Sequence, residues 1–194
     1  MSGTVNSITL GRDTATLNVY LVHPLSVLPH YGSEQSSCFD LHACWNEGQQ
    51  IKTYNGFSDD TEGKTIIAGE VITLPPQSRA LIPTGLIFDI PEGFSIRLHP
   101  RSGKAIKEGL SLINCTGVID SDYILECMIP VVNLSQRDLN IKWSERIAQG
   151  ELRQDGPKVV FEKMPHPPTS KSDRTGGFGS TGVEYKRTSL LLGV

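Results

Sequence analysis

Residues 80–103 read ALIPTGLIFDIPEGFSIRLHPRSG and carry the pattern that decides the fold. Short runs rich in apolar and β-branched residues alternate here with prolines and glycines, which mark turns or strand edges. We therefore expect strands at Ala80–Ile90 and Phe94–Leu98. After the Pro-Arg-Ser-Gly turn, the one plausible helix of the chain is short and covers Ser102–Glu108.

The same pattern continues on both sides of this stretch. Further strands are predicted at Ala15–Val22, Thr65–Leu74, Cys127–Leu134 and Val159–Met164. Long helical periodicity is absent. Many short strands with frequent turn signals are typical of an all-β barrel or jelly roll.

Two segments differ from the rest in composition. Residues 45–64 are polar and weakly patterned, which predicts a long loop or hairpin excursion. Residues 165–182 are rich in proline, glycine and serine, a composition that forms no core element. We expect a β-barrel domain over residues 1–164, with an inserted loop at about 45–64, and a flexible C-terminal arm over residues 165–194.

Composition excludes several functional classes. The 194 residues carry 18 Lys and Arg against 21 Asp and Glu, so the basic excess of a nucleic-acid binder is missing. No apolar run approaches the length of a membrane span, and the N-terminus lacks the pattern of a signal peptide. The four cysteines form no C-x-x-C pair, which argues against zinc. The expected setting is cytoplasmic, with no nucleic-acid or membrane partner.

The C-terminal stretch RTGGFGSTG, residues 174–182, combines glycines with phosphate donors. Glycines allow successive amides to form an anion nest, and an aromatic residue without a core is suited to stacking on a base. The candidate binding residues are Arg174, Phe178, Gly179, Ser180 and Thr181. The alternative is a flexible linker with an incidental phenylalanine.

The turn at Pro100–Gly103 exposes Arg101, Ser102 and the amide of Gly103 together, which would suit a phosphate. The same tetrapeptide is also an ordinary turn that carries an arginine. A Ser/His/Asp triad built from His99 and Ser102 is not indicated, because no nucleophile-elbow pattern surrounds Ser102.

In GVIDSDY, residues 117–123, two carboxylates at i and i+2 follow an apolar strand. Carboxylates spaced in this way at a strand end point the same way, and one could activate a water as general base. An acidic hairpin turn is the alternative. Three single polar residues complete the candidates. Asn114 could read a base edge, Gln149 offers a neutral donor, and Asp40 is a lone acid at a strand start.

The order of these motifs is more specific than any one of them. CFDL, PRSG, GVIDSDY, SERIAQ and RTGGFGSTG resemble, in sequence, the five motifs of trimeric dUTPases, and the likeness covers roughly residues 17–182. The resemblance implies a jelly-roll-like β barrel of the dUTPase (β-clip) type. It also implies a homotrimer whose active sites are shared among subunits and Mg²⁺-dependent hydrolysis of dUTP to dUMP and pyrophosphate.

The resemblance also implies roles for individual residues. Asp120 would position the attacking water, Tyr123 would stack beneath the sugar, and Asn114, with the backbone around Gly117, would read uracil. Ser102, Gly103 and Gln149 would contact phosphates, Arg101 would brace the site, and Asp40 would organise Mg²⁺ through water. Phe178 would cover uracil while the rest of the arm motif closes over the terminal phosphate.

Some positions depart from the family pattern. Tyr123-Ile124-Leu125-Glu126 stands where Tyr-x-Gly-Glu is usual, and residues 45–64 look like an insertion. Three rival functions remain open. One is a nucleotide sensor of the same fold, with residues 45–64 and the tail after residue 182 as surfaces for a protein partner. Another is a trimeric β structural protein, which leaves the Arg, Phe and Gly pattern of residues 174–182 without a reason. The third is a dCTP deaminase, although Pro130 stands where that family places its catalytic glutamate.

Overall fold

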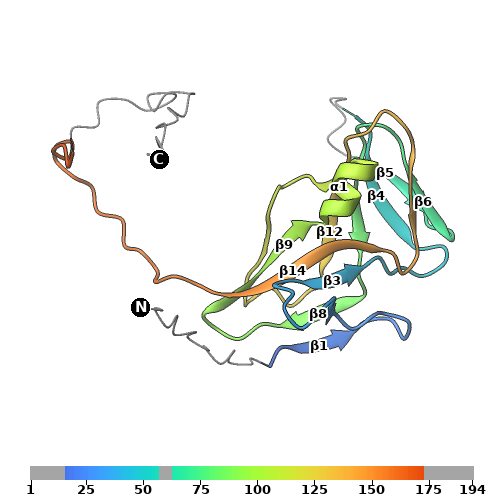
Figure 1. Cartoon of the computed structure of the whole chain (residues 1–194), viewed down its shortest axis with the longest axis horizontal. Helices are drawn as coiled ribbons and strands as arrows, with labels where there is room; N and C mark the ends of the chain where they lie inside the picture. The colour runs from blue at the N-terminus through green and yellow to red at the C-terminus, as the bar shows by residue number, and fades with distance from the viewer. Residues whose placement is uncertain (1–15, 57–62, 173–194) are drawn as a thin grey trace, which may run out of the picture. The chain divides into compact units, whose positions relative to one another are not determined.

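The computed structural model describes residues 16–56 and 63–172, and the chain divides into two units, residues 1–156 and 157–194. Every strand and helix of the described residues lies in the first unit (Figure 1). No helix among them is long and apolar enough to cross a membrane.

Two five-stranded sheets form the first unit. One has the order β10 (Leu110–Leu112), β12 (Met128–Asn133), β7 (Arg79–Pro83), β4 (Gln50–Tyr54) and β5 (Lys64–Ile67). The other has the order β11 (Gly117–Ile119), β9 (Phe94–Pro100), β14 (Arg146–Gln154), β3 (Phe39–His42) and β2 (His30–Tyr31). Two strand pairs complete the unit, β1 (Asn18–Leu21) with β8 (Leu86–Asp89) and β6 (Val71–Leu74) with β13 (Leu139–Lys142).

One hydrophobic core joins the two sheets. Leu41 on β3 and Ile96 on β9 belong to the same buried cluster as Ile82 on β7 and Ile129 on β12. Side chains alternate between the two faces of a strand, so each sheet contributes one apolar face to this core. All strand pairings are antiparallel, and the predicted all-β, jelly-roll-like barrel is confirmed.

The predicted helix is confirmed with the expected bounds as α1 (Ser102–Glu108). By contrast, Ala80–Ile90 is not one strand but two, because the chain turns at Thr84-Gly85 between β7 and β8. Gly85 has a φ of +68°, and a Cβ there would lie 2.1 Å from the Ser26 hydroxyl, so this turn needs glycine. Thr65–Leu74 is likewise divided into β5 and β6 by residues 68–70.

The prediction of a strand at Val159–Met164 is wrong. These residues have no regular structure, and Val160 and Phe161 are 86% and 91% exposed. Apolar alternation produces a strand only where a neighbouring edge accepts its hydrogen bonds, and β14 already ends at Gln154. Residues 45–64 contain β4, which forms a hairpin with β5, and Trp45 at their start is buried.

Candidate active site

A pocket of about 250 Å³ brings together four of the residues singled out from the sequence. Asn114, Gly117, Asp120 and Tyr123 all line it. Its apolar wall is made of Leu81, Leu98, Val118, Ile119, Cys127, Met128 and Pro130. Burial raises the pKa of the Cys127 thiol to about 12, so this wall stays uncharged at neutral pH. An apolar pocket with a few polar groups is the usual form of a small-molecule site.

Gly117 allows the two sides of the pocket to approach closely. It pairs with Leu98 of the neighbouring strand β9. A Cβ at position 117 would lie 3.0 Å from the Leu98 side chain and 3.2 Å from Nδ2 of Asn114. The glycine therefore lets the Asn114 amide lie against the backbone of β11, where base edges could be read.

The two acidic residues of GVIDSDY do not act as a pair. β11 ends at Ile119, and Asp120 and Asp122 belong to the turn that follows. Because turn residues do not alternate as strand residues do, only Asp120 reaches the pocket. The expectation that both carboxylates point the same way from a strand end is wrong, and Asp120 alone is placed to act on a ligand.

Glu126 anchors the segment of residues 120–127, which connects β11 of one sheet to β12 of the other, and it was not among the predicted site residues. The Tyr123 hydroxyl donates to the Glu126 carbonyl oxygen over 3.1 Å, and the Tyr123 amide donates to the Asp120 carbonyl over 3.1 Å. The Glu126 carboxylate in turn accepts the Gly85 amide over 2.7 Å. The sequence signal for this role is the acidic residue three positions after Tyr123. The family pattern Tyr-x-Gly-Glu has a glutamate at the same position.

A second group of predicted residues gathers where β3, β9 and β14 lie side by side. The Asp40 carboxylate binds Arg101 Nε through one oxygen and Arg146 Nη1 through the other, each over 3.0 Å. Gln149 is paired with Asp40 across the sheet and donates its side-chain amide to the Pro100 carbonyl over 3.0 Å. Arg146 was missed, because 106 positions separate it from Asp40 in the chain.

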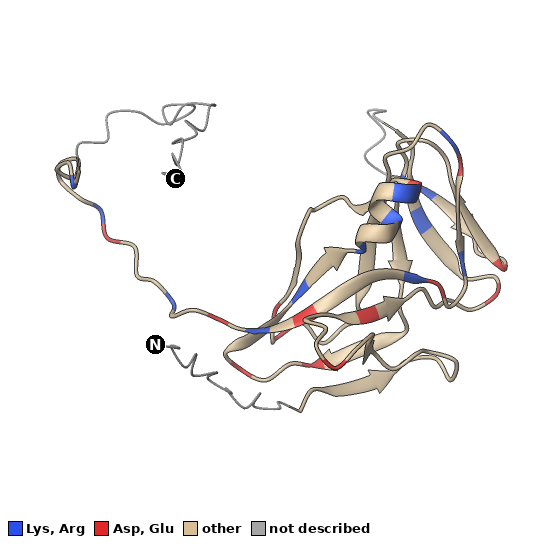
Figure 2. Ribbon diagram, viewed as in Figure 1, with Lys and Arg blue, Asp and Glu red and all other residues tan. Residues whose placement is uncertain are grey.

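Ser102 and Gly103 form the first turn of α1, directly after Arg101. Both are exposed, and a Cβ on Gly103 would meet nothing within 4 Å. Figure 2 shows basic residues on α1 and at the start of β14, with the acidic position on β3 close by. Exposed donors beside fixed cations are suited to phosphate oxygens.

The two groups lie at different positions along β9. Gly117 and Ile119 of the pocket pair with Leu98 and Ile96, which precede Arg101 by three and five residues. At about 3.3 Å per residue, these separations are roughly 10 and 16 Å along the strand. The pocket around Asp120 and the arginine cluster share no residue.

No group of three or more His, Cys, Asp or Glu side chains that could hold a metal ion is found within residues 16–56 and 63–172. Asp40 has both oxygens engaged by arginines, so it is a poor direct ligand and fits better as a partner of metal-bound water. The arm residues Arg174, Phe178, Gly179, Ser180 and Thr181 lie outside the described residues. A larger cavity of about 620 Å³ between Trp45 and Trp143 contains none of the predicted site residues.

Comparison with known proteins agrees with this geometry. The dUTPase family model matches residues 63–182, which include Arg101, Gln149 and the residues of the pocket around Asp120. The chain belongs to the dUTPase family. The deoxyuridine 5'-triphosphate nucleotidohydrolase of Bartonella bacilliformis is 37% identical over 166 residues, covering 80% of this chain and 82% of that protein. The enzyme of the same name from Finegoldia magna is 49% identical over 111 residues, covering 57% and 76%.

Solved structures share the fold. The dUTPase of Staphylococcus bacteriophage 80alpha with dUPNHPP matches with a TM-score of 0.63 and 22% identity, covering 88% of this chain and 100% of that chain. A mutant dUTPase from phage phi11 of S. aureus, in which a structural Mg(II) ion is coordinated, matches with a TM-score of 0.59 and 19% identity, covering 78% and 98%.

Proposed function

We propose that this dUTPase-family chain hydrolyses dUTP to dUMP and pyrophosphate by attack of water on the α-phosphate. The observation that carries the proposal is the pocket in which Asn114, Gly117, Asp120 and Tyr123 meet. It offers an amide for a base edge, an aromatic ring for a sugar and a carboxylate for a water. The nucleotidohydrolases named above support the same substrate.

In this proposal Asp120 is the general base. Its carboxylate is exposed at the pocket and forms no ion pair in the part of the chain that the structure describes. A carboxylate in this state can accept a proton from water as the water attacks phosphorus. Tyr123 closes the pocket beneath the sugar, where the ring leaves no room for a 2′-hydroxyl, and Asn114 selects uracil by hydrogen bonding.

The arginine cluster would hold the phosphates. Phosphoryl transfer is accelerated mainly by positioning and by neutralising charge, which suits Arg101, Ser102, Gly103 and Gln149. When bound, Mg²⁺ would supply positive charge that offsets the charge of the triphosphate. Asp40 would reach that ion through water, because its own oxygens are engaged by Arg101 and Arg146.

A homotrimer would bring the pocket around Asp120 and the arginine cluster together between subunits. Three features support this proposal. The two groups are separated along β9, Val160 and Phe161 are exposed on a segment beyond β14, and the segment between β11 and β12 exposes Ile124 and Leu125. We propose that residues 165–194 form an arm whose Arg174, Phe178, Gly179, Ser180 and Thr181 close over a site.

The rival functions have less support. A dCTP deaminase needs a catalytic acid where Pro130 lines the pocket. A nucleotide sensor would not need the free Asp120 carboxylate. Within residues 45–64, β4 (residues 50–54) is part of a five-stranded sheet and pairs with β7 and β5.

The test is pyrophosphate release from dUTP, dCTP, dTTP and UTP with Mg²⁺, for the native chain and for Asp120→Asn. We expect dUTP-selective release that falls by at least about a hundredfold in Asp120→Asn, since general-base catalysis contributes on that scale. Asp122→Asn is the matched control, because Asp122 lies two residues away and does not line the pocket. The proposal would be refuted by a folded assembly, with three times the 21.2 kDa mass of one chain, that releases pyrophosphate from none of the four triphosphates.

A further inference from the structure

Helix α1 is held in place by polar contacts instead of by the core. None of its seven residues is buried. At its C-terminal end, Gly109 accepts the Leu134 amide over 2.9 Å, and Arg137 donates to the Lys107 carbonyl over 3.4 Å. A short helix without an apolar face has little intrinsic stability, so such contacts decide where its first turn lies.

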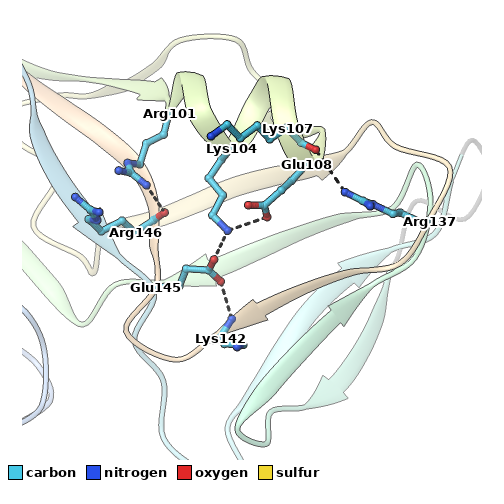
Figure 3. A network of polar contacts seen from close by, with 8 residues as sticks. All are labelled: Arg101, Lys104, Lys107, Glu108, Arg137, Lys142, Glu145 and Arg146. Carbon is cyan, nitrogen blue, oxygen red and sulfur yellow. Dashed lines mark hydrogen bonds and ion pairs between the residues drawn. The ribbon is translucent and has the colours of Figure 1, made fainter.

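Lys104 adds a second contact at that first turn, beside the bonds of the N-cap residue Arg101 to Asp40 and Arg146. Its side chain is only 14% exposed, and its ammonium group binds the carboxylates of Glu108 and Glu145 (Figure 3). Burial opposes the charge of Lys104, but the hydrogen bonds and attraction of the two carboxylates outweigh it, so the pKa of Lys104 is raised. The ammonium group is thus fully compensated within the protein.

Glu145 connects this ammonium group to the start of β14. One of its oxygens binds Lys104, and the other accepts the Lys142 amide over 2.9 Å within a tight turn in which Ser144 has a φ of 60°. The next residue, Arg146, binds Asp40 and accepts a hydrogen bond from Arg101 at its carbonyl oxygen over 3.2 Å. Glu145 therefore fixes the turn from which the arginine cluster begins.

We infer that the Lys104–Glu145 ion pair is a positioning contact, which holds Ser102 and Gly103 at a fixed distance from Arg146 and Gln149. The inference rests on the proposed function, because it concerns how that site grips the β- and γ-phosphates. A lysine so close to Ser102 would ordinarily be taken as a phosphate ligand. Here, moving its ammonium group to a phosphate would leave the Glu145 carboxylate, 22% exposed, without its cation.

Loss of the pair should therefore affect one part of the substrate. The pocket around Asp120, which would hold the nucleoside, has no lining residue from α1. Affinity for dUMP should stay unchanged, whereas affinity for the triphosphate should fall, since small displacements of positioning groups weaken binding steeply.

The experiment compares Lys104→Met, Glu145→Gln and the double variant, with Lys107→Met as the control that removes a lysine from the same helix. The readouts are KM and kcat for dUTP, and calorimetric Kd values for dUMP and for the imido analogue of dUTP. We expect each single variant to raise KM and the analogue Kd about tenfold, with dUMP unchanged. The double variant should be no worse than either single one, because both remove the same contact.

Lys104→Arg, which keeps the pair, should retain near-native affinity and provides a variant that folds if Lys104→Met does not. The inference is overturned if Lys104→Met weakens the analogue while Glu145→Gln leaves it unchanged or tightens it, as a direct phosphate ligand would. It is equally overturned if dUMP and the analogue weaken together, or if Lys107→Met matches Lys104→Met. Failure of the native chain to hydrolyse dUTP would instead count against the proposed function. The inference itself is tested by the affinity of each variant relative to the affinity of the native chain.

Discussion

Asp40 and Arg101 are joined by an ion pair of 3.0 Å between Oδ1 and Nε, which ties the strand β3 to the end of β9. The Asp40 side chain is 12% exposed, and its second oxygen binds Arg146. Two guanidinium groups on one carboxylate form a small network, in which removing the acid leaves both cations without their partner.

Replacing Asp40 by Asn should therefore destabilise the fold as well as the site. We expect the free energy of unfolding to fall by about 1–3 kcal/mol, the usual effect of leaving partly buried polar groups unsatisfied. Urea unfolding followed by circular dichroism measures this. Asp138→Asn, at an exposed position, is the control and should change stability by less than about 0.5 kcal/mol. Equal stability of the two variants would contradict a structural role for the pair.

Glu126 is expected to control sugar discrimination through Tyr123. Glu126→Ala removes the acceptor of the Gly85 amide and loosens the segment whose carbonyl receives the Tyr123 hydroxyl. The ratio of kcat/KM for dUTP to that for UTP should fall about tenfold, which corresponds to about 1.4 kcal/mol. Glu126→Gln retains a side-chain oxygen as acceptor and should keep most of the ratio. An unchanged ratio in Glu126→Ala would show that Tyr123 keeps its position without the bond between Glu126 and the Gly85 amide.

Local sequence signals predicted those parts of the molecule that local interactions determine. Helix α1 has the predicted bounds, and Asn114, Gly117, Asp120 and Tyr123, which are close in sequence, line one pocket. Contacts across the chain were beyond the reach of spacing arguments. Arg146 meets Asp40 across 106 positions, and Lys104 meets Glu145 across 41. Only the strand order places these residues together.

The errors of the sequence analysis have the same origin. Val159–Met164 has the composition of a strand, but a strand requires an edge to pair with, and that depends on other segments. The sequence predicts one continuous strand over Ala80–Ile90. Nothing near Gly85 in the chain indicates that the distant residue Ser26 lies beside it and requires a glycine there. The homotrimer, the arm and the roles of individual site residues remain predictions.

Gly117 should be intolerant of even a methyl group. In Gly117→Ala the new Cβ would lie 3.0 Å from Leu98 and 3.2 Å from Asn114 Nδ2, so either β11 or the Asn114 amide must move. We expect kcat/KM for dUTP to fall about tenfold or more and the preference over dCTP to shrink, because mispositioned base contacts lose selectivity. Gly156→Ala, where a Cβ meets nothing within 4 Å, is the control. Native selectivity in Gly117→Ala would show that Asn114 does not read the base.

Cys127 should make stability depend on alkaline pH. Its thiol is buried in the pocket wall, and burial raises its pKa from 9.0 to about 12. Above pH 9 the unfolded chain loses this proton while the folded chain keeps it, so stability present below pH 9 declines as pH rises toward 12. The slope from this group approaches about 1.4 kcal/mol per pH unit. Urea unfolding between pH 8 and 10.5 gives the free energy of unfolding of the native chain and of Cys127→Ala at each pH. The difference between the two values removes the contribution of groups that titrate in both chains. The native chain should lose more stability over this range than Cys127→Ala, and parallel curves would mean that the thiol ionises as readily in the fold as in the unfolded chain.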